Sequence, residues 1–209
     1  MMMASPASID LSQGLVLGTR NAGKLRELAA LLEPLGIRCQ SLEGLPNAVE
    51  VEETGSTFAE NATLKATQQA TALGLPVLAE DSGLVVDALD GRPGVYSARF
   101  AGPEADDAAN NALLLEKLAG IPPARRSAHY ACHMVLAAAD GSVVATSAGE
   151  CHGRIDHALH GSGGFGYDPL FVVPEYHRSF GEIAGEVKAM ISHRGRALRA
   201  MVDCLRRHH

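Results

Sequence analysis

The chain has 209 residues, a formal net charge of −6 at pH 7 and four cysteines, none of which forms a C-x-x-C pair. Its length allows one domain with a substantial core, and its acidic balance argues against nucleic acid as the main partner, because backbone binding needs a basic face. No apolar run is long enough to cross a membrane, and without a signal-like start we expect reduced cysteines in the cytoplasm.

The first regular structure is expected after residue 13. Residues 1–13 are predicted to form a disordered N-terminal extension, residues 14–207 the folded domain, and residues 206–209 a frayed end. Gly14–Gly18 has the composition of a short strand, and Asn21–Leu35 carries leucines at helical spacing. These leucines, which define the expected buried face, are Leu25, Leu28, Leu31, Leu32 and Leu35.

The turn between this strand and helix is polar. It consists of Thr19, Arg20, Asn21, Ala22, Gly23 and Lys24. Backbone N–H groups at a helix N-terminus, together with the Lys24 ammonium, form a ready anion site. The turn lacks the G-x-x-x-x-G-K-[ST] pattern of a Walker A loop, so an ordinary capped helix start is an equally acceptable interpretation.

A capping box marks the next helix. Ile37–Leu42 is expected to form a strand, and Thr57–Glu60 then predicts a helix over about Phe58–Leu73. Asn61 and Lys65 are four residues apart and share one face of this helix. Their donors would point toward an acidic crevice, although a solvent-facing lysine is the commoner arrangement.

Two adjacent carboxylates define that crevice. Leu75–Ala79 has the composition of a buried strand and places Glu80 and Asp81 at or just beyond its carboxyl end, where open α/β sheets collect ligands. Carboxylates suit Mg²⁺, which takes one or two of them and completes its coordination with water and phosphate oxygens. A D-S-G run after a strand is also typical of a simple turn.

The following segment predicts a helix and a hairpin. Asp106–Leu118 has helix start and stop signals, and Asp140-Gly141 joins the expected strands Ala128–Ala139 and Ser142–Gly149. These strands carry possible metal ligands: His129, Cys132, His133, Cys151 and His152. Because no further ligands follow at zinc-like spacing, a structural role is favoured for them.

A glycine-rich loop precedes the last elements. In Gly161–Asp168 the aromatic residues Phe165 and Tyr167 alternate with glycines, which is typical of a flexible connector or of a loop that stacks a base. Pro169–Val173 is expected to form a strand, and Ser192 to cap a final helix that ends near residue 207. The buried stripe of this helix is predicted to be Ala197, Leu198, Met201, Val202 and Leu205.

Five ordered blocks of the sequence resemble the inosine and xanthosine triphosphate pyrophosphatases, a family that removes deaminated purine nucleotides. The resemblance runs from about Leu15 to Leu205, and the blocks are LGTRNAGKLREL, EETGSTFAENATLKA, AEDSGLVVDALDGRPGVYSARFAG, GSGGFGYDPLF and ISHRGRAL. The resemblance implies a two-lobed single α/β domain around a long mixed β-sheet flanked by helices. It also implies Mg²⁺, a homodimer, and hydrolysis of ITP, dITP or XTP to the monophosphate and pyrophosphate.

The resemblance also assigns site residues by position. It places the triphosphate at Thr19–Lys24 and Lys65, the metal at Glu52 and Asp81, and the general base for water attack on the α-phosphorus at Asp81. The remaining substrate contacts are Ser82, Phe165, Gly166, Tyr167, Asp168, Lys188, His193 and Arg194. The sequence departs from the family at Glu80, where many members have Asp, and at Arg20, where a small residue is common.

The base-side residues favour 6-oxo purines. His193, Arg194 and the backbone N–H groups of residues 163–168 are donors, and these suit the acceptor O6 of inosine and xanthosine. The 6-amino group of adenine would set a donor against a donor, and such a mismatch costs about 1–3 kcal/mol.

Two other functions would use the same groups. A nucleotide phosphatase of another class would release orthophosphate, and a non-catalytic nucleotide sensor would bind without turnover. The carboxylates Glu52 and Asp81 and the site lysines disfavour the sensor, because a simple binder needs no activated water. The apolar segment Val85–Val95, long for an exposed loop, supports the expected homodimer.

Overall fold

The computed structural model describes residue 11 and residues 14–207. The predictions for residues 1–10, 12–13 and 208–209, and for the side chains of residues 204–207, lie outside this description. The elements are β1 (Leu15–Leu17), α1 (Ala22–Leu32), η1 (Glu33–Leu35), β2 (Cys39–Ser41), α2 (Phe58–Leu73), β3 (Val77–Val86), η2 (Asp87–Leu89), η3 (Gly94–Arg99), α3 (Asp107–Lys117), η4 (Pro123–Arg125), β4 (Ser127–Ala137), β5 (Val143–Ile155), β6 (Phe171–Val173), η5 (Pro174–Tyr176), β7 (Arg178–Ser179), α4 (Gly185–Ile191) and α5 (His193–Arg207).

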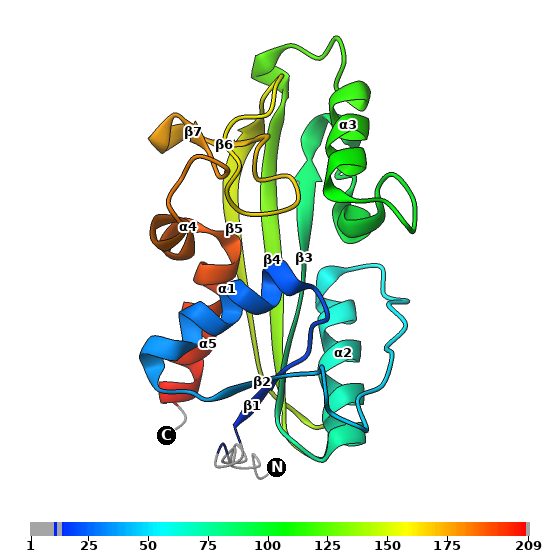
Figure 1. Cartoon of the computed structure of the whole chain (residues 1–209), viewed down its shortest axis with the longest axis vertical. Helices are drawn as coiled ribbons and strands as arrows, with labels where there is room; N and C mark the ends of the chain where they lie inside the picture. Colours follow the sequence, from blue (N-terminus) through cyan, green and yellow to red (C-terminus); the bar gives the residue numbers. More distant parts are fainter. Residues whose placement is uncertain (1–10, 12–13, 208–209) are drawn as a thin grey trace, which may run out of the picture. The chain divides into compact units, whose positions relative to one another are not determined.

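The described strands form a mixed sheet in the order β2-β1-β3-β4-β5-β6-β7 (Figure 1). β1 runs parallel to β2 and to β3, whereas β6 runs antiparallel to β5 and to β7. Helices accompany the sheet, so the predicted α/β class with a mixed sheet is confirmed. No helix in residues 14–207 is both long and apolar enough to span a membrane.

The described chain divides into two compact units. Unit 1 contains the chain up to Asp81, residues 133–148 and the chain from Ala197 onward. Unit 2 contains residues 82–132 and 149–196. β3, β4, β5 and α5 each contribute residues to both units.

The core of unit 1 lies between α2 and the strands. Ala62, Ala66 and Ala70 on α2 are fully buried and pack against Val16 of β1 and Val77 of β3. Small alanines spaced four residues apart let the helix approach the sheet closely. α1 lies on the opposite side of these strands from α2 (Figure 1).

The capping signals gave both ends of α2 correctly. The Thr57 side chain accepts a hydrogen bond from Glu60 N, and the Glu60 carboxylate accepts one from Thr57 N, which is the predicted capping box. Hydrogen bonds from the Ser56 side chain and from the backbone of Ser56 and Thr57 lower the pKa of Glu60. The helix ends at Gly74, which adopts a left-handed conformation.

α1 also begins and ends close to the prediction. Of its predicted buried leucines, Leu28 and Leu32 are buried, but Leu35 is 41% exposed because it belongs to the 3-10 turn η1. Two further elements follow the prediction: Asp106 is the N-cap of α3, and the Ser192 hydroxyl accepts from Gly195 N at the start of α5.

The core of unit 2 is larger and contains aromatic rings. Tyr130, Phe171 and Phe180 contact one another, with centroid distances of 4.8 to 6.0 Å. Val86 and Leu89 join the same cluster. The apolar residues of the Val85–Val95 segment are therefore partly used inside this chain, so their hydrophobicity alone does not argue for a dimer.

The main correction to the predicted elements concerns β3. The strand was expected to end at Ala79, with Glu80 and Asp81 beyond it, but it continues to Val86. Glu80 and Asp81 are consequently buried residues within a strand, 1% and 5% exposed. The D-S-G run forms neither a crevice loop nor a turn.

Candidate active site

The predicted site residues fall into two groups. Unit 1 contains the turn Thr19–Lys24 together with Glu52, Lys65 and Asp81. Unit 2 contains the other predicted contacts: Ser82, Phe165, Gly166, Tyr167, Asp168, Lys188, His193 and Arg194. Asp81 and Ser82 are consecutive residues of β3, so the two groups meet in the sequence at this strand.

The Asp81 carboxylate is the centre of the group in unit 1. Lys65 Nζ donates to Asp81 Oδ1 at 2.8 Å, and Asn61 Nδ2 donates a longer hydrogen bond to Asp81 Oδ2 at 3.4 Å. Asn61 and Lys65 thus turn toward the acidic group, as their spacing on α2 predicted. One helix face supplies a donor to each oxygen of one buried carboxylate.

A second carboxylate shares the lysine. Lys65 Nζ also lies 3.1 Å from Glu53 Oε1. Burial acts to lower the pKa of Lys65, but the charges of Asp81 and Glu53 outweigh it and raise the pKa above its ordinary value. Lys65 is therefore a firmly charged ammonium between two carboxylates. Glu52, the predicted metal ligand, is exposed and lies in the acidic loop before α2.

Asn61 also fixes the loop that carries these glutamates. It is fully buried, and its Oδ1 accepts from Gly55 N at 2.8 Å. A Cβ atom at residue 55 would lie 2.6 Å from Asn61 Oδ1, so only glycine fits this close approach. The amide of Asn61 therefore links the end of the acidic loop to Asp81.

The polar turn after β1 adopts the predicted helix start. Asn21 is the N-cap of α1 and accepts from Lys24 N at 3.0 Å, while the Thr19 hydroxyl accepts from Asn21 N at 3.2 Å. Arg20 donates to Val49 O at 3.2 Å and is exposed. β1 and β3 are parallel, and Leu17 lies opposite Leu78. The turn that follows β1 therefore begins close to the part of β3 that contains Asp81.

The donor set of this group suits a hard divalent cation. The exposed carboxylate of Glu52 and the Asp81 oxygens are the oxygen ligands that Mg²⁺ prefers, and each Asp81 oxygen keeps a lone pair beyond its single hydrogen bond. In the part of the chain that is described, no three His, Cys, Asp or Glu side chains are arranged to hold a metal.

The group in unit 2 is built on a buried ion pair. Lys188 Nζ lies 2.5 Å from Asp168 Oδ2, and both side chains are almost fully buried. The same Asp168 oxygen accepts from Phe165 N at 2.8 Å. A Cβ atom at residue 164 would collide with this carboxylate, and Gly164 has φ +75°, so the loop requires glycine there.

Two cations lie over the Phe165 ring. Lys188 Nζ is 5.1 Å and Arg194 Cζ 5.6 Å from its centroid, distances at which cation–π attraction operates. Arg194 is 1% exposed and donates to the Ser82 hydroxyl at 3.0 Å. The structure therefore brings together Ser82, Phe165, Lys188 and Arg194, while their contacts with a substrate stay a prediction.

His193 has an aromatic neighbour that the sequence did not reveal. Its ring stacks on Tyr130 of β4 with a centroid distance of 4.7 Å and an interplanar angle of 10°. Tyr130 is 63 positions away in the chain, so no local pattern could have indicated this contact. The stack fixes the plane of the His193 ring.

The glycine-rich loop differs from the prediction in two ways. Tyr167 does not offer its ring to a base, because it is 3% exposed in the core and its hydroxyl donates to Ser97 O at 2.8 Å. Burial raises the pKa of this hydroxyl well above its ordinary value.

The loop amides are also less available than expected. The N–H groups of four residues already donate within the protein: Gly163 to Gly181 O, Phe165 and Gly166 to carboxylates, and Asp168 to Phe165 O. These four N–H groups are therefore not available as the donors that were expected to face a substrate oxygen.

Sequence reasoning missed three residues that hold the site. Glu53 contacts Lys65, and Asp107 and Asn111 of α3 bind Gly166. The adjacent glutamates 52 and 53 are equivalent in composition, and only the path of the backbone decides which one faces Lys65. Asp107 and Asn111 are spaced by four residues on one helix face, and this spacing was the only available signal.

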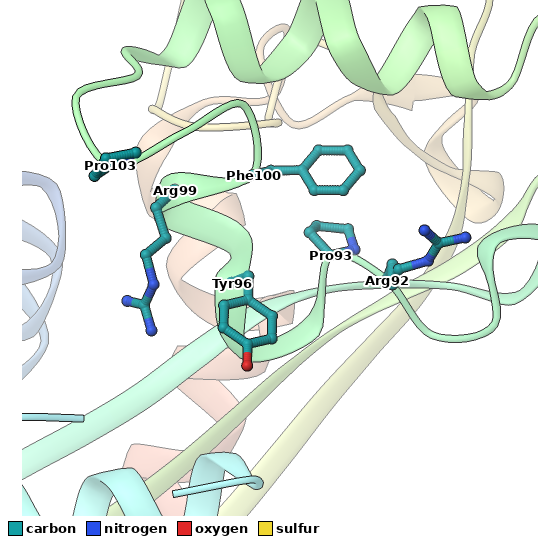
Figure 2. A pocket seen from close by; sticks show the side chains of 6 residues that line it. All are labelled: Arg92, Pro93, Tyr96, Arg99, Phe100 and Pro103. Carbon is teal, nitrogen blue, oxygen red and sulfur yellow. The ribbon is translucent and has the colours of Figure 1, made fainter. Parts of the chain in front are cut away.

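A surface pocket lies elsewhere in unit 2. It has a volume of about 360 Å³ and is lined by Arg92, Pro93, Tyr96, Arg99, Phe100 and Pro103 (Figure 2). Tyr96 is 58% exposed, and Arg99 Cζ lies 5.2 Å from its ring centroid. Figure 2 shows the rings of Tyr96, Pro93 and Phe100 close together, flanked by the two arginines.

Known proteins resemble this chain along most of its length. The Ham1 family model matches residues 15–204. A protein of an Exiguobacterium species named dITP/XTP pyrophosphatase is 53% identical over 187 residues, which cover 90% of this chain and 94% of that protein. A protein of the same name from Rhodopirellula baltica is 53% identical over 193 residues, which cover 92% and 93%.

Solved structures give the same result. The Ham1 protein of Staphylococcus aureus has a TM-score of 0.82 and 36% identity, with 93% of this chain and 99% of that chain covered. A structure from Mycobacterium abscessus, described as a nucleoside-triphosphatase and dITP/XTP pyrophosphatase, has a TM-score of 0.72 and 42% identity, with coverage of 91% and 98%. At 36% and 42% identity, these proteins resemble this chain in sequence as well as in fold.

Proposed function

Because this chain belongs to the Ham1 family, we propose that it is a nucleoside triphosphate pyrophosphatase that hydrolyses non-standard purine nucleoside triphosphates. Its substrates are inosine, deoxyinosine and xanthosine triphosphates, and its products are the nucleoside monophosphate and pyrophosphate. The observation that carries the proposal is the buried Asp81 carboxylate, which receives donors from Lys65 and Asn61 in unit 1. A strand that served only the packing of a hydrophobic core would not require a buried carboxylate.

The triphosphate is assigned to unit 1. The turn Thr19–Lys24 ends at the N-terminus of α1, where backbone N–H groups and the helix dipole favour an anion. Lys24 and Lys65 add positive charge against the phosphates. Positioning and charge neutralisation supply most of the rate in phosphoryl transfer, so these groups are the expected source of catalysis.

Asp81 is assigned the catalytic role. It orients a water toward the α-phosphorus and accepts its proton, while the bond from the α-phosphorus to the bridging oxygen breaks and the electron pair leaves with pyrophosphate. Lys65 and Asn61 hold the carboxylate in one orientation during this step. Glu52 and Asp81 would hold Mg²⁺, which when bound neutralises phosphate charge.

The base and sugar are assigned to unit 2. Arg194 and His193 are donors on the first turn of α5, where a cation gains nothing from the helix dipole, so another role accounts for their position. They suit the O6 acceptor of inosine and xanthosine and not the 6-amino group of adenosine. The contacts of Ser82 and Phe165 with Arg194 support its placement there.

Assembly and location follow from other features. A homodimer is favoured by the exposed Tyr96 and the arginine-flanked pocket around it. Among the described residues, Cys39 and Cys151 are free thiols, which favours the reducing environment of the cytoplasm.

The experiment measures product and base preference together. Inosine, xanthosine, adenosine and guanosine triphosphates are each incubated with the enzyme and Mg²⁺, and products are separated by ion chromatography. We expect pyrophosphate, and a kcat/KM for inosine triphosphate about a hundredfold above that for adenosine triphosphate. Release of orthophosphate would instead identify a phosphatase, and binding without turnover a nucleotide sensor.

A further inference from the structure

The two peptide groups that flank the Cα atom of Gly166 are held by one helix. Gly166 N donates to Asp107 Oδ2 at 2.6 Å, and Gly166 O accepts from Asn111 Nδ2 at 2.8 Å. Asp107 and Asn111 are one turn apart on α3, and they contact a residue that is 59 and 55 positions away in the sequence. The hydrogen bond to the Asp107 carboxylate holds the peptide group that precedes Gly166 Cα, and the hydrogen bond from the Asn111 amide holds the peptide group that follows it. Together they restrain the backbone on both sides of this glycine.

The orientation of the Asn111 amide is determined by its neighbours. Its Nδ2 donates to two carbonyl oxygens, Gly166 O and Asp107 O at 2.7 Å. Its Oδ1 has no hydrogen-bond partner among the described residues. The side chain is 5% exposed, so exchanging the donor for an oxygen would set three acceptors against one another in a buried place.

The neighbours of Gly166 are fixed by other elements. Phe165 N binds Asp168, Asp168 binds Lys188 of α4, and the Tyr167 hydroxyl binds Ser97 of η3. Gly166 has φ +62° and no side chain, so it can be held only through its backbone. Asp107 and Asn111 of α3 provide these backbone hydrogen bonds.

We infer that Asp107 and Asn111 are positioning residues that clamp the two peptide groups on either side of Gly166 and thereby set the geometry of the base-side loop Phe165–Asp168. The inference deepens the proposed function, because it rests on the assignment of this loop to the base and sugar. Neither residue needs to touch the substrate. Their effect is expected in KM for nucleotides, through misplacement of the Phe165 ring and its cations, and much less in kcat.

Three variants separate the clamp from helix stability. Asp107→Ala removes the acceptor and leaves Gly166 N–H without its partner, whereas Asp107→Asn keeps an acceptor oxygen. Asp106→Ala is the matched control, because Asp106 caps α3 by accepting from Ala109 N at 2.8 Å and has no part in the clamp. Loss of the cap weakens the same helix without touching the loop.

The kinetic test uses inosine triphosphate and inorganic tripolyphosphate, which lacks a base. We expect Asp107→Ala to raise KM for inosine triphosphate about tenfold with kcat within about twofold, and Asp107→Asn to stay near the parent. Inhibition by tripolyphosphate should be unchanged in all variants. An equal rise of KM in Asp106→Ala, or no rise in Asp107→Ala, would overturn the inference.

A second measurement does not depend on activity. Hydrogen exchange of the peptide covering residues 161–168 should be faster in Asp107→Ala than in the parent, restored in Asp107→Asn and unaffected in Asp106→Ala. Equal protection in the parent and Asp107→Ala contradicts the clamp. If the parent enzyme released no pyrophosphate while the exchange pattern held, the proposed function would fail and the clamp would stand.

Discussion

Asp81 and Lys65 form a largely buried ion pair in unit 1. The ammonium of Lys65 faces two carboxylates, so loss of the Asp81 charge would leave Lys65 paired with Glu53, whereas removing Lys65 would leave the buried Asp81 carboxylate without its cation. This arrangement holds the Asp81 carboxylate in one orientation in the folded chain. It also explains why Lys65 is buried, although a lysine on a helix face is usually solvated.

The variant Asp81→Asn tests the role of that charge. The amide keeps the size of the side chain but removes the proton acceptor and the negative charge, so we expect turnover with inosine triphosphate to fall at least about a thousandfold. Thermal unfolding should shift only slightly, because the side chain keeps its shape. Asn61→Ala is a useful companion, since it removes one donor and leaves the carboxylate. Turnover within a few-fold of the parent in Asp81→Asn would show that another group activates the water.

Which residues lie near one another could be predicted better than how their side chains are oriented. The sequence indicated that Asn61, Lys65 and Asp81 belong together, because a helix face and an adjacent acidic pair are local patterns. It could not tell Glu52 from Glu53, and it left Tyr167 as a stacking ring although its ring lies in the core. These outcomes depend on backbone path and packing between segments distant in sequence, which leave no mark on local composition.

Helix ends were the most predictable feature among the elements. α2 begins at the expected capping box and stops before a left-handed glycine, because both signals act through hydrogen bonds within a few residues. β3 was predicted too short for the opposite reason. Its middle contains Asp81, Ser82 and Gly83, which have low strand propensity, and tertiary pairing overrides that preference.

The capping box offers a stability test at this scale. Thr57→Ala removes the side-chain acceptor of Glu60 N and should destabilise the chain by about 1 kcal/mol, measured by urea unfolding. Thr57→Ser keeps the hydroxyl and should restore most of the loss. A Thr57→Ala chain as stable as the parent would mean that water satisfies the helix start equally well.

At the scale of the whole molecule, the predicted α/β class with a mixed sheet is correct, while the assembly stays a prediction. The apolar Val85–Val95 segment does not by itself favour a homodimer, because Val86 and Leu89 pack in this chain's own core. The exposed residues Tyr96 and Arg99 favour the homodimer more directly. Exposed tyrosine next to arginine is the composition enriched at protein interfaces and their energetic centres, and Tyr96 and Arg99 provide it.

The matched variants Tyr96→Asp and Tyr176→Asp test this surface. Both tyrosines are exposed side chains of unit 2, at 58% and 44%, but only Tyr96 lines the pocket shown in Figure 2. A buried aspartate without a partner is costly, so Tyr96→Asp should weaken a dimer strongly, whereas Tyr176→Asp should leave it intact. Light scattering at micromolar protein should give twice the chain mass for the parent and Tyr176→Asp, and the single-chain mass for Tyr96→Asp. A parent that is monomeric under these conditions would refute the dimer, and a dimeric Tyr96→Asp would place the interface on another surface.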